Sequence, residues 1–195
     1  MKKIVMLLLW MIAAVPATAH ASWNLGQWYP GPNGHNYSVQ KITGDNTWAN
    51  ANAQALLLVD PAGNPCNLAA ISSSTEDEFI FDGINANAYW AIGTSSDNEG
   101  PFLGGFQYDK LAEPAGHWAW VTGEPWTFTQ WYAGKPDNTN GNEDVLNFYA
   151  RSSSWNDIVT QKYVISYYVA ESVPEPTSLA IVALGAITLL RRSRK

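Results

Sequence analysis

The sequence predicts an α+β domain in which two helices flank mostly antiparallel sheets, with a long irregular loop region. Two observations support this fold class: the helix-type segments come early in the chain, and the strand-type segments cluster late. A third is the stretch 94–134, which is crowded with glycine, proline and aromatic residues and therefore predicts the loop region. No internal repeat interrupts this order.

The first half of the domain contains the two predicted helices. Apolar and polar residues alternate over 35–41, which predicts a strand. Thr47 is suited to cap a helix over about 48–59, and the turn residues of 60–65 end it. A short strand is expected at 68–71.

The second helix is expected to begin at a capping box. Thr75 and Glu78 have the required spacing, and Phe79, Ile80 and Ile84 would then face inward. The strands expected after this helix cover residues 89–93, 144–149, 155–159 and 162–171.

The N-terminal end of the chain has the three zones of a secretory signal peptide. Lys2 and Lys3 are followed by an apolar run and then by small residues at Ala19 and Ala21. Residues 1–21 are therefore predicted to be a signal peptide that signal peptidase cuts after Ala21. A short N-terminal membrane anchor is the alternative, but the apolar run is too short to span a bilayer.

The C-terminal end combines Pro174, Glu175 and Pro176 with an apolar run over 179–190 and a basic terminus. As a helix this run covers roughly 18 Å, against about 30 Å of bilayer core. It would hold a membrane only transiently, with the terminal cations on the cytoplasmic side and the domain outside.

This arrangement resembles a PEP-CTERM sorting signal, here over 173–195. The resemblance implies processing by an exosortase in a Gram-negative bacterium, often one that makes extracellular polysaccharide. It also implies export to the cell surface or the medium, with a transient inner-membrane anchor. An ordinary C-terminal transmembrane anchor is the alternative.

The domain left between the two ends, residues 22–172, is strongly acidic. It contains five basic and sixteen acidic residues, a net charge of −11, whereas the whole chain carries −6. Such a surface excludes nucleic-acid binding and is compatible with divalent cations. Cys66 is the only cysteine, so no intrachain disulfide can form, and burial is favoured over pairing between chains.

Nothing in the sequence predicts an enzyme. His35 and His117 lie far apart, without a nucleophile motif nearby. Glu143 and Asp144 are adjacent on a predicted strand, where neighbouring side chains point to opposite faces.

Landmarks over residues 35–171 together resemble a C-type lectin-like domain, which predicts that fold for the domain. The matching positions are Trp48, 67–72, 90–93, 118–120, Gly123, Trp131, 134–138, 142–144, 155–157 and 168–171. The family's disulfide cysteines are replaced by Ala55, Val145 and Ala170.

The resemblance implies a calcium site that also binds a sugar. Its ligands would be Asp137, Glu143, Asn156 and Asp157. Calcium takes six to eight oxygen ligands, which these residue types supply. The same four residues would bind the glycan, with Trp126 stacking on the sugar, although core packing is the alternative for Trp126.

Lys135 stands where the family has Glu or Gln. An ammonium group has no lone pair for a metal, so Lys135 either swings outward or replaces calcium among the acids. Glu78 and Glu171 are a further pair that could hold a structural ion or serve as ordinary surface acids. The predicted function is calcium-assisted carbohydrate binding associated with exopolysaccharide. The alternative is a calcium-independent protein-interaction or structural surface domain.

Overall fold

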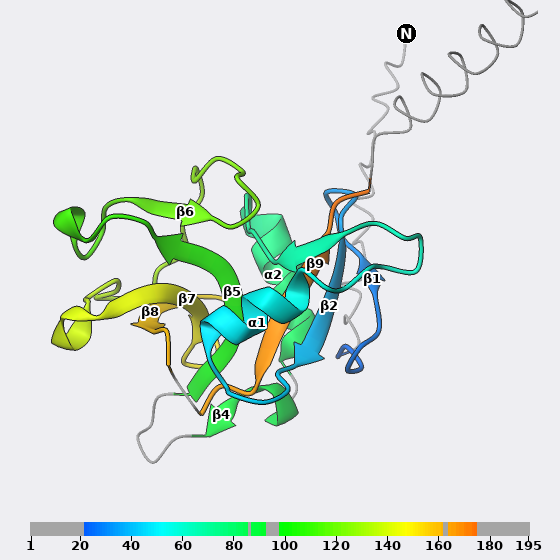
Figure 1. Cartoon of the computed structure of the whole chain (residues 1–195), viewed down its shortest axis with the longest axis horizontal. Helices are drawn as coiled ribbons and strands as arrows, with labels where there is room; N and C mark the ends of the chain where they lie inside the picture. The colour runs from blue at the N-terminus through cyan, green and yellow to red at the C-terminus, as the bar shows by residue number, and fades with distance from the viewer. Residues whose placement is uncertain (1–21, 86, 93–97, 162–163, 175–195) are drawn as a thin grey trace, which may run out of the picture.

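The computed structural model describes residues 22–85, 87–92, 98–161 and 164–174 (Figure 1). Its helices and strands are β1 (Tyr29–Pro30), β2 (Asn36–Lys41), α1 (Trp48–Ala55), β3 (Cys66–Leu68), α2 (Ser74–Ile84), β4 (Ala91–Ile92), β5 (Asn98–Gln107), β6 (Trp118–Trp120), β7 (Glu143–Tyr149), β8 (Trp155–Val159) and β9 (Tyr167–Ser172). The predicted signal peptide, Glu175, Pro176 and the apolar run lie outside the described residues. Within those residues, no helix has the length and apolar character needed to cross a membrane.

The strands form one sheet that is almost entirely antiparallel, which confirms the α+β class. The order is β1-β2-β9-β5-β7-β8, with β3 also paired to β9, and with β4 and β6 paired to β5. Among the paired strands that the structure describes, only β5 and β9 run parallel, and an isolated parallel bridge joins Trp131 to Trp155. The early strand β2 pairs along its length with the last strand β9, so the two ends of the domain lie side by side (Figure 1).

The first helix begins where the sequence predicts and ends earlier. The Thr47 side chain accepts a hydrogen bond from the backbone N–H of Asn50, as an N-cap does. The helix ends at Ala55 rather than near residue 59. After Ala55 the N–H groups of Leu57 and Leu58 donate to carbonyl oxygens three residues back, so the chain leaves α-helical bonding there, and the buried carboxylate of Asp60 then holds the following turn through the N–H groups of Ala62 and Asn64.

The second helix is capped by Ser73, and the predicted Thr75–Glu78 capping box is wrong. Ser73 Oγ accepts from the N–H of Glu76, so the helix begins two residues earlier than expected. Ile80 and Ile84 are fully buried, as predicted from their spacing.

The prediction of an irregular loop over 94–134 is also wrong in part, because it contains β5 and β6. The ten-residue β5 lies between β9 and β7 in the centre of the sheet. Its glycines mark close packing: a Cβ on Gly104 would lie 2.7 Å from the carbonyl oxygen of Leu68, and one on Gly100 would lie 2.7 Å from Cβ of Phe148. The glycine-rich composition therefore predicted a loop where the chain forms a central strand.

The other predicted strands are present in the structure, with boundaries that differ from the prediction by no more than five residues. β7 and β8 agree with the prediction to within one residue. β3 lies over Cys66–Leu68 rather than 68–71, β4 is reduced to Ala91–Ile92 after a 3₁₀ turn, and β9 begins at Tyr167 rather than at 162.

The core contains no disulfide among the described residues and is rich in aromatic rings. Ala55, Val145 and Ala170, which the sequence resemblance aligns with disulfide cysteines, are all buried in one apolar cluster. Cys66 is buried, as predicted, and burial raises the pKa of its thiol to about 11. On the other side of the sheet, Trp155 is completely buried and lies 5.6 Å from the ring centre of Trp120.

Candidate functional site

Three of the four predicted calcium ligands meet beside β7 and β8. Asp137, Glu143 and Asp157 each place a carboxylate oxygen within 4.8 Å of the others. Glu143 begins β7 and Asp157 lies within β8, and these two strands are paired antiparallel. Asp137 comes from the loop that precedes them, so the sheet fixes two acids and the loop supplies the third.

Backbone hydrogen bonds fold the loop around the two buried acids. Asp157 accepts from the N–H groups of Asp137 and Asn138, the latter at 2.6 Å. Glu143 Oε2 accepts from the N–H of Thr139 at 3.0 Å, and the Glu143 N–H donates to the Asn138 side chain. The carboxylates therefore organise the loop as well as facing one another.

Burial and mutual repulsion shift the pKa values of the three acids. Burial, reinforced by the charge of Asp157, raises the pKa of Glu143 to about 7. Burial likewise raises the pKa of Asp157. Burial also acts to raise the pKa of Asp137, but hydrogen bonds from Lys135 and Thr139 outweigh it and lower that pKa. Such a concentration of negative charge favours a cation.

Asn156, the fourth predicted ligand, is buried next to Asp157 in β8. It lies opposite Asn147 in the register of β7 and β8. Its side-chain Oδ1 accepts no hydrogen bond from the residues that the structure describes. A buried oxygen left without a donor is costly, and the role of Asn156 as a calcium ligand stays a prediction.

Lys135 neutralises one member of the acidic group. Its ammonium donates to Asp137 Oδ1 at 3.0 Å and lies 5.6 Å from the ring centre of Tyr149. Asp137 Oδ1 also accepts from the Thr139 hydroxyl at 2.9 Å. Lys135 is thus directed at the most exposed of the three acids, while Glu143 and Asp157 are buried.

Trp126 belongs to a cluster of tryptophan rings. Its ring centre lies 4.4 Å from that of Trp120 and stacks at 5.8 Å on Trp118. It also lies 6.0 Å from Trp155. These contacts agree with the packing interpretation, and contact of Trp126 with a sugar stays a prediction.

A second cluster lies between β2, α2 and β9, and it joins Glu171 to His35 and Glu76 rather than to Glu78. His35, Glu76 and Glu171 have ligand-type atoms within 4.8 Å of one another. Glu78 is exposed on another face of α2, because the Ser73 cap turns Glu76 inward instead. The spacing of Ser73 and Glu76 in the sequence was the signal that could have identified this residue.

The members of this second cluster are hydrogen-bonded to one another and to neighbouring groups of the protein. The Tyr37 hydroxyl donates to Glu76 and lies 3.2 Å from Oε1 of Glu171, and His35 Nδ1 is hydrogen-bonded to Glu171. The Ala70 N–H donates to the other oxygen of Glu171 at 2.8 Å. The bond to Glu171 raises the pKa of His35, and burial raises the pKa of Glu171.

Comparison with known proteins establishes the fold and the C-terminal motif. Residues 172–195 match the PEP-CTERM protein-sorting motif, which indicates an exported protein. The C-type lectin CEL-I from Cucumaria echinata has 22% identity and a TM-score of 0.55, with 76% of this chain and 96% of that chain covered. No curated protein matches the sequence in a direct search.

Two further structures show how widely this fold is used. The cow C-type carbohydrate-recognition domain of CD23, in the presence of a GlcNAc2Man3 oligosaccharide, has 17% identity and a TM-score of 0.57, covering 80% of this chain and 100% of that chain. A calcium-independent type II antifreeze protein has 21% identity and a TM-score of 0.52, covering 79% and 97%. The chain therefore combines a C-type lectin-like fold with a PEP-CTERM sorting motif. At these identities the likeness defines the fold alone.

Proposed function

We propose that this chain is an exported carbohydrate-binding protein of the cell surface or extracellular space, with a calcium-assisted site at Asp137, Glu143, Asn156 and Asp157. The observation that supports this most is the meeting of three carboxylates within 4.8 Å, two of them buried. Burying acids so close together is costly unless a cation compensates them. Lys135 supplies one positive charge against three acids.

The donor set fits calcium in its chemistry. Each carboxylate oxygen has more than one lone pair, so the backbone N–H bonds to Asp157 and Glu143 leave acceptor capacity unused. Asn156 adds an amide oxygen without a hydrogen-bond donor among the described residues. When bound, calcium would offer open coordination positions to two vicinal sugar hydroxyls. The flanking acids and amide would hold those hydroxyls by hydrogen bonds.

The ligand class follows from the fold and the sorting motif together. The CD23 neighbour was crystallised in the presence of an oligosaccharide, which supports a glycan as the ligand class here. The sorting motif supports processing by an exosortase after signal peptidase, with transient insertion of the tail in the inner membrane of a Gram-negative bacterium. We therefore propose exopolysaccharide or a similar glycan as the partner, and binding rather than catalysis as the activity.

Calcium-independent interaction is the second candidate. The contact between Lys135 and Asp137 favours it, because the ammonium already compensates one acid where a metal would bind. The calcium-independent antifreeze neighbour is compatible with this reading. In that case the domain would bind a protein or serve as a structural surface module.

Melting curves of the full chain in detergent, with calcium and with EDTA, separate the two candidates. The proposed site predicts a higher Tm in calcium, followed by calorimetric heat on adding galactose- or mannose-type sugars. If only Lys135→Gln gains a calcium response, the calcium-independent candidate holds for the natural protein. Lys110→Gln is the matched control, since Lys110 pairs with Asp144, which is not one of the three acids.

A further inference from the structure

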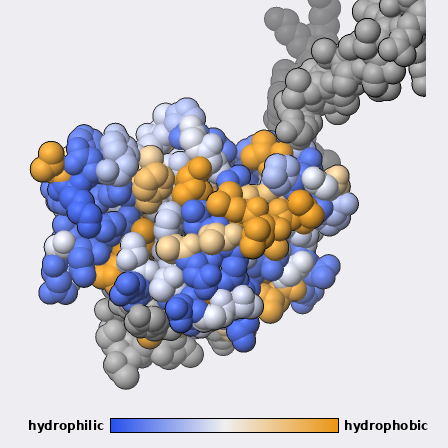
Figure 2. All heavy atoms as spheres, viewed as in Figure 1, coloured by the Kyte–Doolittle hydropathy of each residue, from blue (hydrophilic) through white to orange (hydrophobic). Residues whose placement is uncertain are grey.

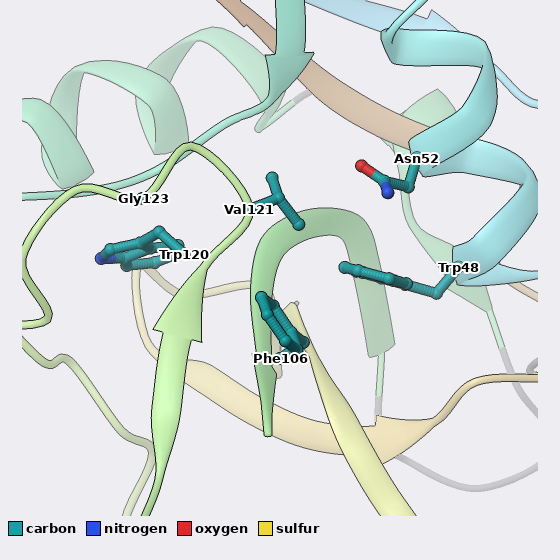
Figure 3. Close-up of a pocket in the computed structure, with 6 residues that line it drawn as sticks. All are labelled: Trp48, Asn52, Phe106, Trp120, Val121 and Gly123. Atoms are coloured by element: carbon teal, nitrogen blue, oxygen red, sulfur yellow. The ribbon is translucent and has the colours of Figure 1, made fainter. Parts of the chain in front are cut away.

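A pocket with aromatic walls lies between α1 and the ends of β5 and β6 (Figure 3). Its volume is about 410 Å³. The residues that line it are Trp48, Asn52, Phe106, Trp120, Val121 and Gly123. None of these is charged, and none belongs to the acidic group at Asp137, Glu143 and Asp157.

The aromatic walls of the pocket are fixed by the fold. The indole N–H of Trp48 donates to the carbonyl oxygen of Leu103 at 2.7 Å, which holds its ring at one orientation. The Phe106 ring lies 6.1 Å from it at an interplanar angle of 43°. Trp120 is buried and packs against Trp126 and Trp155. Rigid walls reduce the entropy lost when a ligand binds.

Asn52 gives the pocket a polar group with an unused acceptor. Trp48 and Asn52 are four residues apart on α1, so they share one helical face and both point toward Val121 and Phe106 (Figure 3). Asn52 Oδ1 is buried and accepts no hydrogen bond from the described residues. The terminal amide torsion of Asn is broad, so a small rotation can present either amide atom to a ligand. The nitrogen end of Trp120 is turned away from Trp48, so the polar contact is assigned to Asn52 (Figure 3).

Apolar surface continues from the pocket along α1. Figure 2 shows hydrophobic side chains gathered near the centre of the view, over the end of α1 and the segment after it. Leu56 is 57% exposed and continues the helical face of Trp48 and Asn52. Exposed apolar surface beside a pocket is typical of a binding site rather than of an inert face.

We propose that this pocket is a second, cation-independent carbohydrate site that takes a neutral pyranose ring of the β-glucoside type. Such a ring has equatorial hydroxyls, so its C–H groups form apolar faces that pack on aromatic side chains. The Asn52 amide, which can both donate and accept, would bond two adjacent hydroxyls. The volume suits one or two sugar rings, and the uncharged lining disfavours an ionic ligand.

This site shares no residue with the one in the proposed function, so the two can be tested apart. The probes are methyl β-D-glucopyranoside and cellobiose, titrated by calorimetry into the full chain in detergent containing EDTA. We expect binding in EDTA, at least tenfold weakening by Asn52→Leu, and a similar loss with Val121→Phe, which fills the pocket. Asp157→Asn removes an acid of the other site and should leave this binding unchanged. Far-UV circular dichroism and Tm confirm that each variant is folded.

The indole N–H signal of Trp48 offers a local readout by NMR. Cellobiose should shift this signal in the wild-type protein in EDTA and not in Asn52→Leu. Absence of binding in EDTA, or binding that neither pocket variant weakens, would overturn the second site. Binding that requires calcium and is lost in Asp157→Asn would also overturn it, while supporting the site at Asp137. Binding in EDTA without any calcium response would support the pocket and overturn the calcium-assisted site instead.

Discussion

The indole N–H of Trp155 donates to Oδ1 of Asp77 at 2.8 Å, and this bond joins β8 to α2 inside the core. Both side chains are almost completely buried. Burial raises the pKa of Asp77 to about 7, although the bond from Trp155 acts in the opposite direction. The folded protein is therefore more stable when the Asp77 carboxyl group, which helps to hold the aromatic cluster, is protonated.

Asp77→Asn should make the protein more stable at neutral and alkaline pH. The folded state holds the proton of Asp77 more tightly than the unfolded state, so the wild-type protein loses stability as the pH rises from about 4 to about 7. Asparagine keeps an acceptor for Trp155 without a titrating charge, and should gain on the order of 1–2 kcal/mol at pH 8. Urea unfolding of the full chain at pH 5 and pH 8 measures this difference. Equal effects of the substitution at both pH values would contradict the assignment.

The calcium response should depend on Asp157 and not on Asp144, the residue that follows Glu143 in the chain. Asp157 belongs to the group of three acids, whereas Asp144 bonds to Lys110. Asp157→Asn should abolish the rise of Tm in calcium, because it removes one of two buried negative charges. Asp144→Asn is the matched control and should keep the full response. A response that survives Asp157→Asn would place the cation elsewhere.

The sequence predicted features whose determinants are local. The Thr47 cap and the strands β7 and β8 depend on residues close together in the chain, and the structure confirms them. The central strand β5 was missed because its glycines are explained only by contacts with distant residues such as Leu68 and Phe148. Composition cannot distinguish a glycine that turns the chain from one that lets two strands pack closely.

The candidate site residues also fall into those that the sequence indicated and those that only the tertiary fold brings together. The family resemblance indicated Asp137, Glu143 and Asp157, and the structure brings these acids together. The place of Glu76 beside Glu171 was missed, because a shift of two residues in the cap of α2 changes which side chain faces inward. The aromatic pocket could not be predicted, since its walls come from residues 48–52 and 106–123, which only the tertiary fold places together.

Gly104→Ala tests the explanation for the missed strand. The new methyl group would lie 2.7 Å from the carbonyl oxygen of Leu68 and 3.0 Å from that of Ala69, and backbone atoms in a central sheet cannot easily move. We expect a loss of about 3 kcal/mol in the free energy of unfolding. Gly63→Ala is the control. A methyl group at Gly63 would meet open space, but φ is +89° there, so the free energy of unfolding should fall by only about 1–2 kcal/mol. Urea unfolding measures both losses. A loss for Gly104→Ala that is equal to or smaller than the loss for Gly63→Ala would contradict the close-packing explanation.

Cys66 should be chemically inert while the domain is folded. The residue is 1% exposed, and burial raises the pKa of the thiol to about 11, so the reactive thiolate is scarce at pH 8. We expect an aromatic disulfide reagent to react at least a hundredfold more slowly with the native full chain than with the same chain in urea. The rate in native buffer should follow the rate of unfolding, and Gly104→Ala should raise it because that substitution weakens the fold. Rapid reaction without urea, or covalent dimers on a non-reducing gel of the native protein, would show instead that the thiol reaches the surface and pairs between chains.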